Sequence, residues 1–288
     1  MAHRALPQLA RHYRLYALVR ATEPTQAAKF AAFGVTAIHG DLDRPATLQR
    51  LAGLAELVLH FAPPPECGSL DTRTRHLIAA LQRGKILPRR LVYISTSGVY
   101  GDCGGARVSE TRGAVPRTPR AGRRVDAERQ LRRWGSSGGP VVSILRAPGI
   151  YAAERLPVER IRRGDPVLSG EDDVFTNHIH ADDLARCTLA ALRYGRPNRV
   201  YHASDDSVLR MADWFDAVAA ACELPPPRRV SRAEAEKLLA PLTLSFMSES
   251  RRLDNTRIKR ELRVRLSYPD VGAGLAGISA SRSSAWPA

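Results

Sequence analysis

Short apolar runs alternate with amphipathic stretches along almost the whole chain. Six runs are rich in β-branched and aromatic residues, as is typical of buried parallel strands, and lie at residues 13–20, 35–38, 55–61, 91–96, 141–146 and 199–203. Apolar positions at helical spacing predict helices at residues 3–12, 25–33, 46–54, 72–83, 119–134, 211–222, 231–239 and 255–262. A further helix is predicted to begin within residues 177–183 and to end near Tyr194, with Asp182 or Asp183 as its N-cap. This alternation predicts an α/β fold, a doubly wound parallel sheet with right-handed crossovers.

The stretch at residues 91–101 is the centre of this pattern. Its apolar run ends in Ser95, Thr96 and Ser97, followed by Gly98 and then by Val-Tyr-Gly. In doubly wound sheets, ligands bind outside the carboxyl ends of the strands. The three hydroxyl groups therefore either face a ligand crevice or form a turn that caps the next segment.

Composition narrows the class of protein. The chain has 288 residues, of which 44% are hydrophobic and 25% charged, which is ordinary for an enzyme-sized globular protein. No apolar window approaches a membrane span and the N-terminus lacks a secretory signal, so we expect a cytoplasmic protein that does not enter membranes. The four cysteines form no C-x-x-C pair, which indicates reduced thiols and no zinc site.

Net charge is the unusual property, at +15. Only four of the 44 basic residues are lysines, and the arginines are spread along the whole chain. A nucleic-acid-binding protein more often concentrates its charge in one stripe. We therefore expect mainly a solvated arginine-rich surface, with anionic ligands such as cofactor phosphates as the next explanation and nucleic acid as an unlikely partner.

Several motifs, in order along the chain, resemble the extended short-chain dehydrogenase/reductases, also called NAD-dependent epimerase/dehydratases. They are Gly40–Leu42, Val92–Gly101, Ile144–Tyr151, Ile179–Asp183 and the C-terminal segments 253–262 and 268–269. The resemblance implies a Rossmann-like sheet formed by residues 1–150 and 177–203. It also implies a small C-terminal substrate lobe formed by residues 151–176 and 204–270, followed by a loose tail at 276–288.

The first departure from this family lies at the N-terminus. The family opens with a strand and a G-x-x-G-x-x-G turn that holds the cofactor diphosphate, whereas the strand at residues 13–20 resembles the family's second strand. We expect the first strand and its turn to lie upstream of Met1, or the fold to have diverged and lost them.

The second departure concerns the family's catalytic Tyr-x-x-x-Lys pair. Counting back from Ala127 and Glu128 places the pair at Arg120 and Arg124. An arginine stays protonated and cannot act as an acid or base, so Arg120 cannot replace the tyrosine. Arg124 is a candidate fixed cation near the ribose, and the chain resembles atypical members of the family.

The resemblance also assigns candidate roles. Thr96 would bind the substrate oxygen and Tyr100 is the nearby phenol, either an acid or base or a packing residue. The cofactor-binding candidates are Arg20, Asp41, Leu42, Ala62, Pro63, Ser95 and Pro148. Arginine at position 20 suits the 2′-phosphate of NADP, so we favour NADP over NAD.

The substrate-binding candidates are Ser97, Arg146 and His180. His178, His180 and Asp182 alternate in a way that could hold a metal, but the segment matches a structural motif of the family, so we expect no metal. The sequence predicts an NAD(P)-dependent oxidoreductase or epimerase that acts on a small carbonyl or sugar-type substrate, in which Tyr100 or water supplies the proton. The alternative is a non-catalytic NAD(P)-binding sensor or partner-binding module, and a homodimer is one possible assembly.

Overall fold

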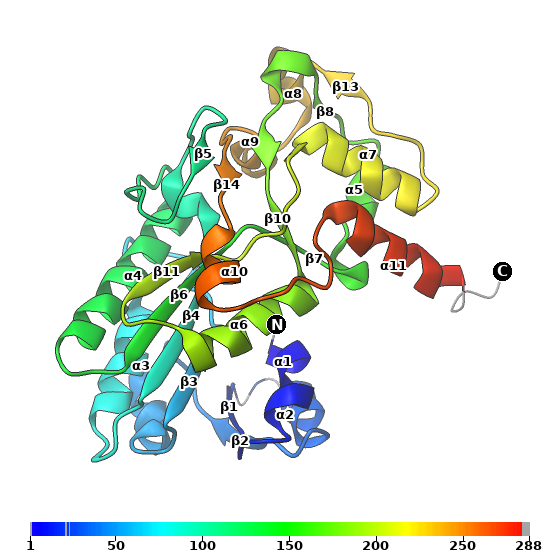
Figure 1. Ribbon diagram of the computed structural model, residues 1–288. Coiled ribbons are helices and arrows are strands. Elements are labelled where there is room, and N and C mark those ends of the chain that lie inside the picture. The colour runs from blue at the N-terminus through cyan, green and yellow to red at the C-terminus, as the bar shows by residue number, and fades with distance from the viewer. Residues whose placement is uncertain (1, 21, 23, 284–288) are drawn as a thin grey trace.

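The central sheet has four parallel strands in the order β11-β6-β4-β3. These strands are β3 (Leu57–His60), β4 (Arg90–Thr96), β6 (Val141–Ala147) and β11 (Arg199–His202). The structure is a computed structural model, and it describes residues 2–283 except residues 21 and 23. The predicted α/β fold with a parallel sheet is confirmed (Figure 1).

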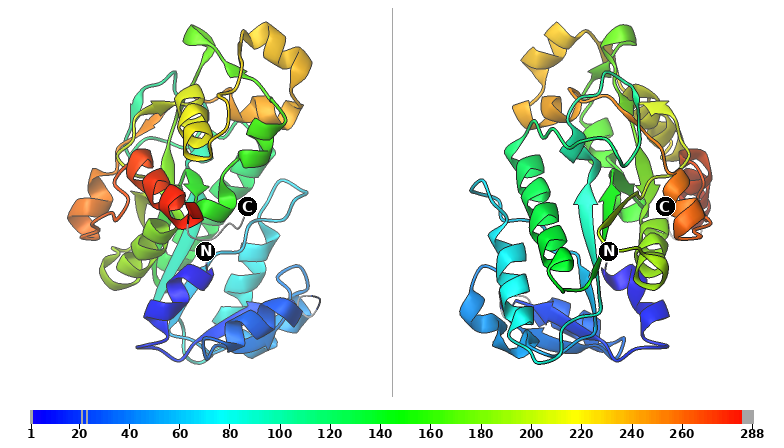
Figure 2. Two further views of the ribbon diagram at one scale, coloured as in Figure 1. Left: turned by 90° about the vertical axis from the view of Figure 1, so that its right-hand side faces the viewer. Right: turned by 60° about the vertical axis from the view of Figure 1, so that its left-hand side comes forward.

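Helices cover both faces of this sheet, as Figure 2 shows. Val92 and Ile94 of β4 pack with helices α1 (Ala2–Leu9) and α6 (Ala181–Tyr194), whereas Leu91 and Tyr93 pack with α3 (Thr72–Gln82) and α4 (Pro119–Ser136). Side chains alternate between the two faces of a strand, and both faces of β4 are buried. Every side chain of β4 is therefore apolar or hydrogen-bonded.

A separate two-stranded sheet lies beside β3 at the lower edge of the view in Figure 1. It pairs β1 (Tyr16–Val19) with β2 (Thr36–His39) in parallel and is followed by the 3₁₀ helix η1 (Pro45–Leu51). Helix α2 (Pro24–Ala31) connects the two strands. Among the described residues, β1 pairs only with β2 and β3 only with β4, so the two sheets are not joined by backbone hydrogen bonds.

Most of the remaining elements form short strand pairs and helices above the carboxyl end of the central sheet, whereas α10 lies beside β11 (Figure 1). The strands are β5 (Arg107–Val108), β7 (Gly149–Tyr151), β8 (Val167–Leu168), β9 (Phe175–Thr176), β10 (His178–His180), β12 (Leu209–Arg210), β13 (Arg229–Val230) and β14 (Arg252–Leu253). The helices are η2 (Ser97–Tyr100), η3 (Ala153–Arg155), α5 (Val158–Arg162), η4 (Gly170–Asp172), α7 (Met211–Ala221), α8 (Arg232–Leu238), α9 (Pro241–Phe246), α10 (Thr256–Glu261) and α11 (Val271–Ser283). Residues 276–283 of the segment expected to be a loose tail belong to α11, and residues 284–288 lie outside the described part of the chain.

Two local predictions need correction. The helix expected at residues 46–54 is the shorter η1, which has Pro45 in its first turn. Helix α6 is capped by His180, whose side chain accepts from the Asp182 backbone N–H, and not by Asp182 or Asp183. Asp183 is fully buried and accepts from the backbone N–H groups of Ser267 and Tyr268 at 2.9 and 2.8 Å. Its carboxylate therefore holds the chain segment that precedes α11.

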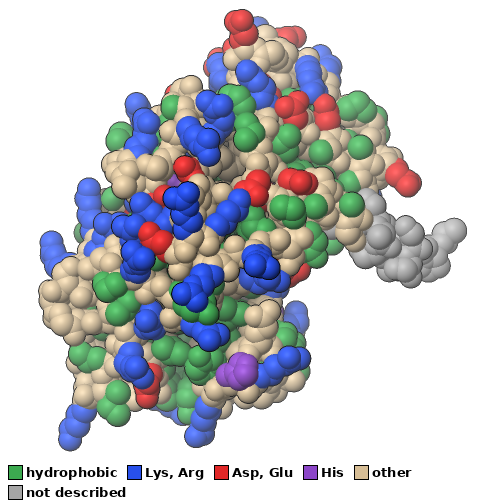
Figure 3. All heavy atoms as spheres, viewed as in Figure 1, with side chains coloured by type: hydrophobic (Ala, Val, Ile, Leu, Met, Phe, Trp, Pro, Cys, Tyr) green, Lys and Arg blue, Asp and Glu red, His purple; other side chains and the backbone are tan. Residues whose placement is uncertain are grey.

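Basic side chains are scattered over the face shown in Figure 3, with acidic and apolar groups between them. This agrees with the expected arginine-rich surface. No helix in the described part of the chain is both long and apolar enough to span a membrane.

We expect Asp183→Ala to lower the free energy of unfolding by roughly 2–4 kcal/mol, because two buried backbone donors lose a charged acceptor. Asp182 is the matched control: its side chain is 43% exposed and pairs with Arg4 at the surface, so Asp182→Ala should cost about 1 kcal/mol or less. Urea unfolding of both variants measures the difference. Equal losses would contradict the assignment of Asp183 as the anchor.

Candidate functional site at the carboxyl edge of the sheet

The three hydroxyl residues at the end of β4 have different surroundings. Ser95 is buried, and its Oγ donates to Glu128 Oε1 at 2.6 Å. Ser97 is also buried and begins η2. Thr96 is half-buried, and its Oγ1 accepts from the Gly98 N–H at 3.2 Å. Of the three hydroxyl groups, Thr96 therefore has the most solvent access at this edge.

A buried ion pair lies directly behind this turn. Arg146 of β6 donates through Nε to Glu128 Oε1 at 3.0 Å and through Nη2 to Oε2 at 2.6 Å, and the two side chains are only 6% and 5% exposed. This two-point geometry fixes both side chains. The sequence predicted that Arg146 binds substrate. In the described structure its Nη1 has no hydrogen-bond partner, and its guanidinium lies 4.7 Å from the centre of the Tyr100 ring.

Tyr100 points into the protein. Its Oη lies 2.6 Å from His202 Nε2, while His202 Nδ1 lies 2.9 Å from the backbone carbonyl oxygen of Asp254. Because a carbonyl can only accept, Nδ1 carries the proton and Tyr100 donates to Nε2. Burial raises the pKa of Tyr100 and lowers the pKa of His202 to about 3. Both groups are therefore neutral at pH 7, and the phenol proton is directed at His202.

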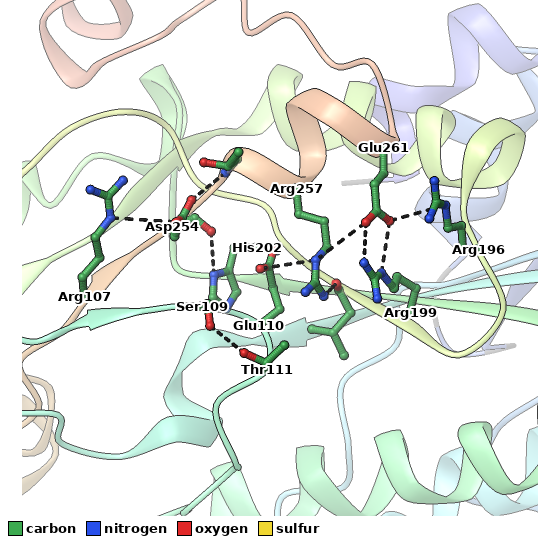
Figure 4. Close-up of polar contacts among 12 residues, drawn as sticks. Arg107, Ser109, Glu110, Thr111, Arg196, Arg199, His202, Asp254, Arg257 and Glu261 are labelled. Carbon is green, nitrogen blue, oxygen red and sulfur yellow. Dashed lines mark hydrogen bonds and ion pairs between the residues drawn. The ribbon is translucent and has the colours of Figure 1, made fainter.

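His202 is the inner end of a polar network whose outer end is the exposed Arg196 (Figure 4). Its backbone N–H donates to Glu110 Oε1 at 3.1 Å, and Glu110 in turn pairs with Arg257 at 3.5 Å. Arg257 lies 4.0 Å from Glu261, which also pairs with Arg199. These contacts fix the end of β11 against α10, so His202 is held on both sides.

The two arginines at the expected Tyr-x-x-x-Lys positions lie on α4. Arg124 points toward β4, where its Nη1 donates to the Ile94 carbonyl at 2.7 Å and to Tyr93 Oη at 3.0 Å. Arg120 is exposed in the first turn of the helix. Arg124 is thus a cation fixed close to the carboxyl end of β4, and Arg120 faces solvent.

The expected cofactor residues follow the ends of four strands. Arg20 directly follows β1, Asp41 and Leu42 follow β2, Ala62 and Pro63 follow β3, and Pro148 follows β6. Arg73 joins two of these ends, since it pairs with Asp43 at 2.6 Å and donates to the Pro63 carbonyl at 3.1 Å. The Arg73 guanidinium, and to a smaller extent Arg20, lower the pKa of Asp43. The carboxyl ends of β1, β2 and β3 therefore lie at one edge.

The alternating histidines are enclosed by aromatic rings. His178 stacks on Trp214 with ring centres 4.1 Å apart, and His180 lies 3.9 Å from the ring centre of Tyr268. Burial lowers the pKa of His180, which favours its neutral form. No cluster of three metal-binding side chains occurs in the part of the chain that the structure describes.

Sequence reasoning did not assign Glu128, His202 or Glu110 to the site. Arg146 carried a usable signal, because a charged residue inside an otherwise apolar strand requires a buried carboxylate nearby. The partners of Tyr100 gave no such signal, since His202 lies 102 residues further along the chain.

A doubly wound parallel sheet with polar groups gathered at its carboxyl edge defines the class of nucleotide-binding α/β proteins. The model of the NAD dependent epimerase/dehydratase family matches residues 3–204. The chain belongs to this family, as the sequence motifs indicated.

Individual relatives agree with this family. The chain is 26% identical over 256 residues to a 3-diazoavenalumate denitrifying reductase from a Streptomyces species, covering 81% of this chain and 83% of the relative. A conserved protein of unknown function from Silicibacter pomeroyi DSS is 28% identical with a TM-score of 0.77, covering 96% and 94% of the two chains. The dTDP-glucose 4,6-dehydratase of Streptomyces venezuelae, solved as a double mutant with NAD and DAU bound, shares the fold at 21% identity with a TM-score of 0.77, covering 99% and 94%.

The described residues fit a nicotinamide dinucleotide only in part. Candidate contacts for its nucleoside ends follow β1, β2, β3 and β6. None of the turns that join β1, β2 or β3 to the next helix has the G-x-x-G-x-x-G pattern that cradles a diphosphate.

The buried ion pair yields a test of stability. Glu128→Leu leaves the Arg146 guanidinium buried without its carboxylate, so we expect a loss of roughly 3–5 kcal/mol in the free energy of unfolding. The double variant Glu128→Leu/Arg146→Met removes both charges and should recover most of that loss. Chemical denaturation of the three proteins checks this. A single variant as stable as the parent would show that the pair is not desolvated.

The buried His202 yields a pH-dependent test. Its folded-state pKa of about 3 lies below the ordinary value of 6.5, so the stability it confers is complete above pH 6.5 and is lost as the pH falls toward 3. We expect His202→Asn to reduce the slope of unfolding free energy between pH 6 and pH 4 by about 1.4 kcal/mol per pH unit. The exposed His12 provides the control variant His12→Asn, which should leave the slope unchanged. An unchanged slope in His202→Asn would contradict a neutral buried imidazole.

Proposed function

We propose that this protein is an NAD(P)-dependent oxidoreductase or epimerase-like enzyme that acts on a small carbonyl or sugar-type substrate. The observation that carries the proposal is the half-buried Thr96 hydroxyl at the carboxyl end of β4 in a member of this family. The relatives support the substrate class, since one is named a reductase and another a dTDP-glucose 4,6-dehydratase. The substrate would lie between the sheet edge and the lobe formed by residues 151–176 and 204–270.

The local hydrogen bonds favour a donor role for Thr96. Its oxygen accepts from the Gly98 N–H, so its own O–H proton is available for a substrate carbonyl oxygen. A nicotinamide ring, when bound, would exchange a hydride with the substrate carbon. Thr96 would then stabilise the negative charge that develops on the oxygen.

The proton that the substrate oxygen receives would come from a group other than Tyr100. The Tyr100 phenol is 1% exposed and donates to His202, so of the two expected sources the geometry favours water. Arg124 would act as a fixed cation beside the end of β4. The exposed Arg120 is suited to an anionic substrate group, whereas the Arg146 guanidinium is buried against Glu128 and the Tyr100 ring.

We favour NADP over NAD because Arg20 follows β1 at the position where an arginine suits a 2′-phosphate. Arg20 is exposed. Its positive charge also contributes to the low pKa of Asp43, which places it beside the loop after β2.

A second function is favoured by one observation. Arginines occupy both positions of the expected Tyr-x-x-x-Lys pair, and the Tyr100 phenol is bound to His202. A dinucleotide-binding sensor without catalysis would need none of these proton-transfer groups.

Fluorescence titration with NADPH and NADH, followed by turnover assays on carbonyl and sugar-nucleotide panels, separates the two functions. We expect tighter binding of NADPH, and a fall in kcat of roughly 100-fold in Thr96→Val, because a hydroxyl that stabilises a transition-state oxyanion is lost. The exposed Thr111 provides the control variant Thr111→Val, which should retain full activity. Dinucleotide binding without turnover on any panel would establish the sensor function, and equal kcat in both variants would exclude Thr96 as the donor.

A further inference from the structure

The positive charge of the chain is concentrated on one pair of helices. Residues 72–90 and 117–137, which contain α3, α4 and the loops next to them, hold 13 of the 44 lysines and arginines but only two of the 29 acidic residues, a net charge of +11. The whole chain has a net charge of +15. The two helices pack side by side on one face of the central sheet, in front in the right-hand view of Figure 2. This face therefore carries most of the excess charge.

The two acidic residues of these segments are engaged within the protein. Glu128 is buried in its pair with Arg146. Asp126 is half-buried, and its Oδ2 accepts from the Asp71 backbone N–H at 2.8 Å and from Gln130 Nε2 at 2.6 Å. Neither carboxylate is therefore available to neutralise the exposed arginines of the two helices.

Four exposed arginines define what we call the basic helix face. They are Arg75 in α3, Arg83 at its end, and Arg129 and Arg133 in α4. Their side chains make no hydrogen bond or ion pair with any described residue. Arg129 and Arg133 are like charges four residues apart, which destabilises a helix. Carboxylates bound over this face would remove that repulsion.

Small residues lie on the same exposed sides of the two helices. Ala79 is one turn from both Arg75 and Arg83, and it is exposed. Gly122 is two turns before Arg129, and a Cβ added to it would meet no atom within 4 Å. Small side chains at such positions allow a second helix to approach closely.

Two other occupants fit this face poorly. None of the exposed large apolar side chains of the described residues lies in α3 or α4, so no ring is available to stack on the bases of a single strand. Both helices pack along the central sheet, and neither projects to enter the groove of a duplex. A second copy of this chain would bring the same four arginines against themselves, and like charges oppose such a contact.

We propose that the basic helix face binds an acidic helix of a partner protein. Aspartates and glutamates of that helix pair with the four arginines, because a planar guanidinium binds a carboxylate at two points. Small residues of the partner face Ala79 and Gly122. Thr96 takes no part in this contact, so the inference is independent of the enzymatic activity proposed above.

The probe is a stapled, fluorescein-labelled helix of about 20 residues, long enough to cover α4, with glutamates on one face and alanines elsewhere. We expect it to bind the full chain in a fluorescence anisotropy titration. The face variant Arg75→Glu/Arg83→Glu/Arg129→Glu/Arg133→Glu should bind it roughly tenfold or more weakly, because each attractive pair becomes repulsive.

The matched control variant has the same net charge as the face variant. It replaces four exposed arginines outside these helices by glutamate, at Arg11, Arg228, Arg260 and Arg265. Its affinity for the probe should fall by less than about threefold, since only the long-range field changes. Circular dichroism and Tm establish that both variants are folded. A probe with lysines in place of the glutamates should reverse the preference and bind the face variant more tightly than the parent chain.

Several results would overturn the proposal. Equal loss of affinity in the face and control variants would show attraction by net charge alone. Tighter binding of a labelled DNA duplex than of the acidic helix, lost in the face variant, would identify nucleic acid as the occupant. Dimerisation of the parent chain that is lost in the face variant, measured by light scattering, would identify a second copy. No binding of the acidic helix to the parent chain would also contradict the proposal.

Discussion

The interruption of backbone hydrogen bonding between β1 and β3 is the constraint on which the rest of this structure depends. In the described part of the chain the two strands share no backbone hydrogen bonds, and an apolar cavity of about 730 Å³ lies between them. The small sheet is therefore held to the rest of the molecule by side-chain packing, such as that of Ile38 and Leu42 with Leu77 and Leu81 of α3.

The central sheet is held together by its own polar groups. The Glu128–Arg146 pair joins α4 to β6, and Ser95 adds β4 to the same carboxylate. The Tyr100–His202 hydrogen bond joins η2 to β11. These contacts lie behind the carboxyl edge and away from the cavity, so the turn that carries Thr96 is positioned by the four-stranded part alone.

The fold was predictable from sequence where one physical rule dominates. The strands β4 and β6 were predictable from continuous runs of β-branched and apolar residues, because a strand that is buried on both faces has apolar side chains at successive positions. The rule that ligands bind at carboxyl ends directed attention to Thr96. The cap of α6 was assigned to the wrong residues, since His180 and the aspartates are all able to accept from a helix N-terminus. The partner of Tyr100 could not be predicted, because tertiary packing alone brings His202 to it.

The chemistry at the edge follows from which groups can exchange protons at neutral pH. Tyr100 and His202 are buried, neutral and hydrogen-bonded to each other. Arg120 and Arg124 are permanent cations. Thr96 can donate a hydrogen bond but does not ionise near pH 7. None of these groups is free to take or give a proton at neutral pH, which is why the reaction proposed above draws its proton from water.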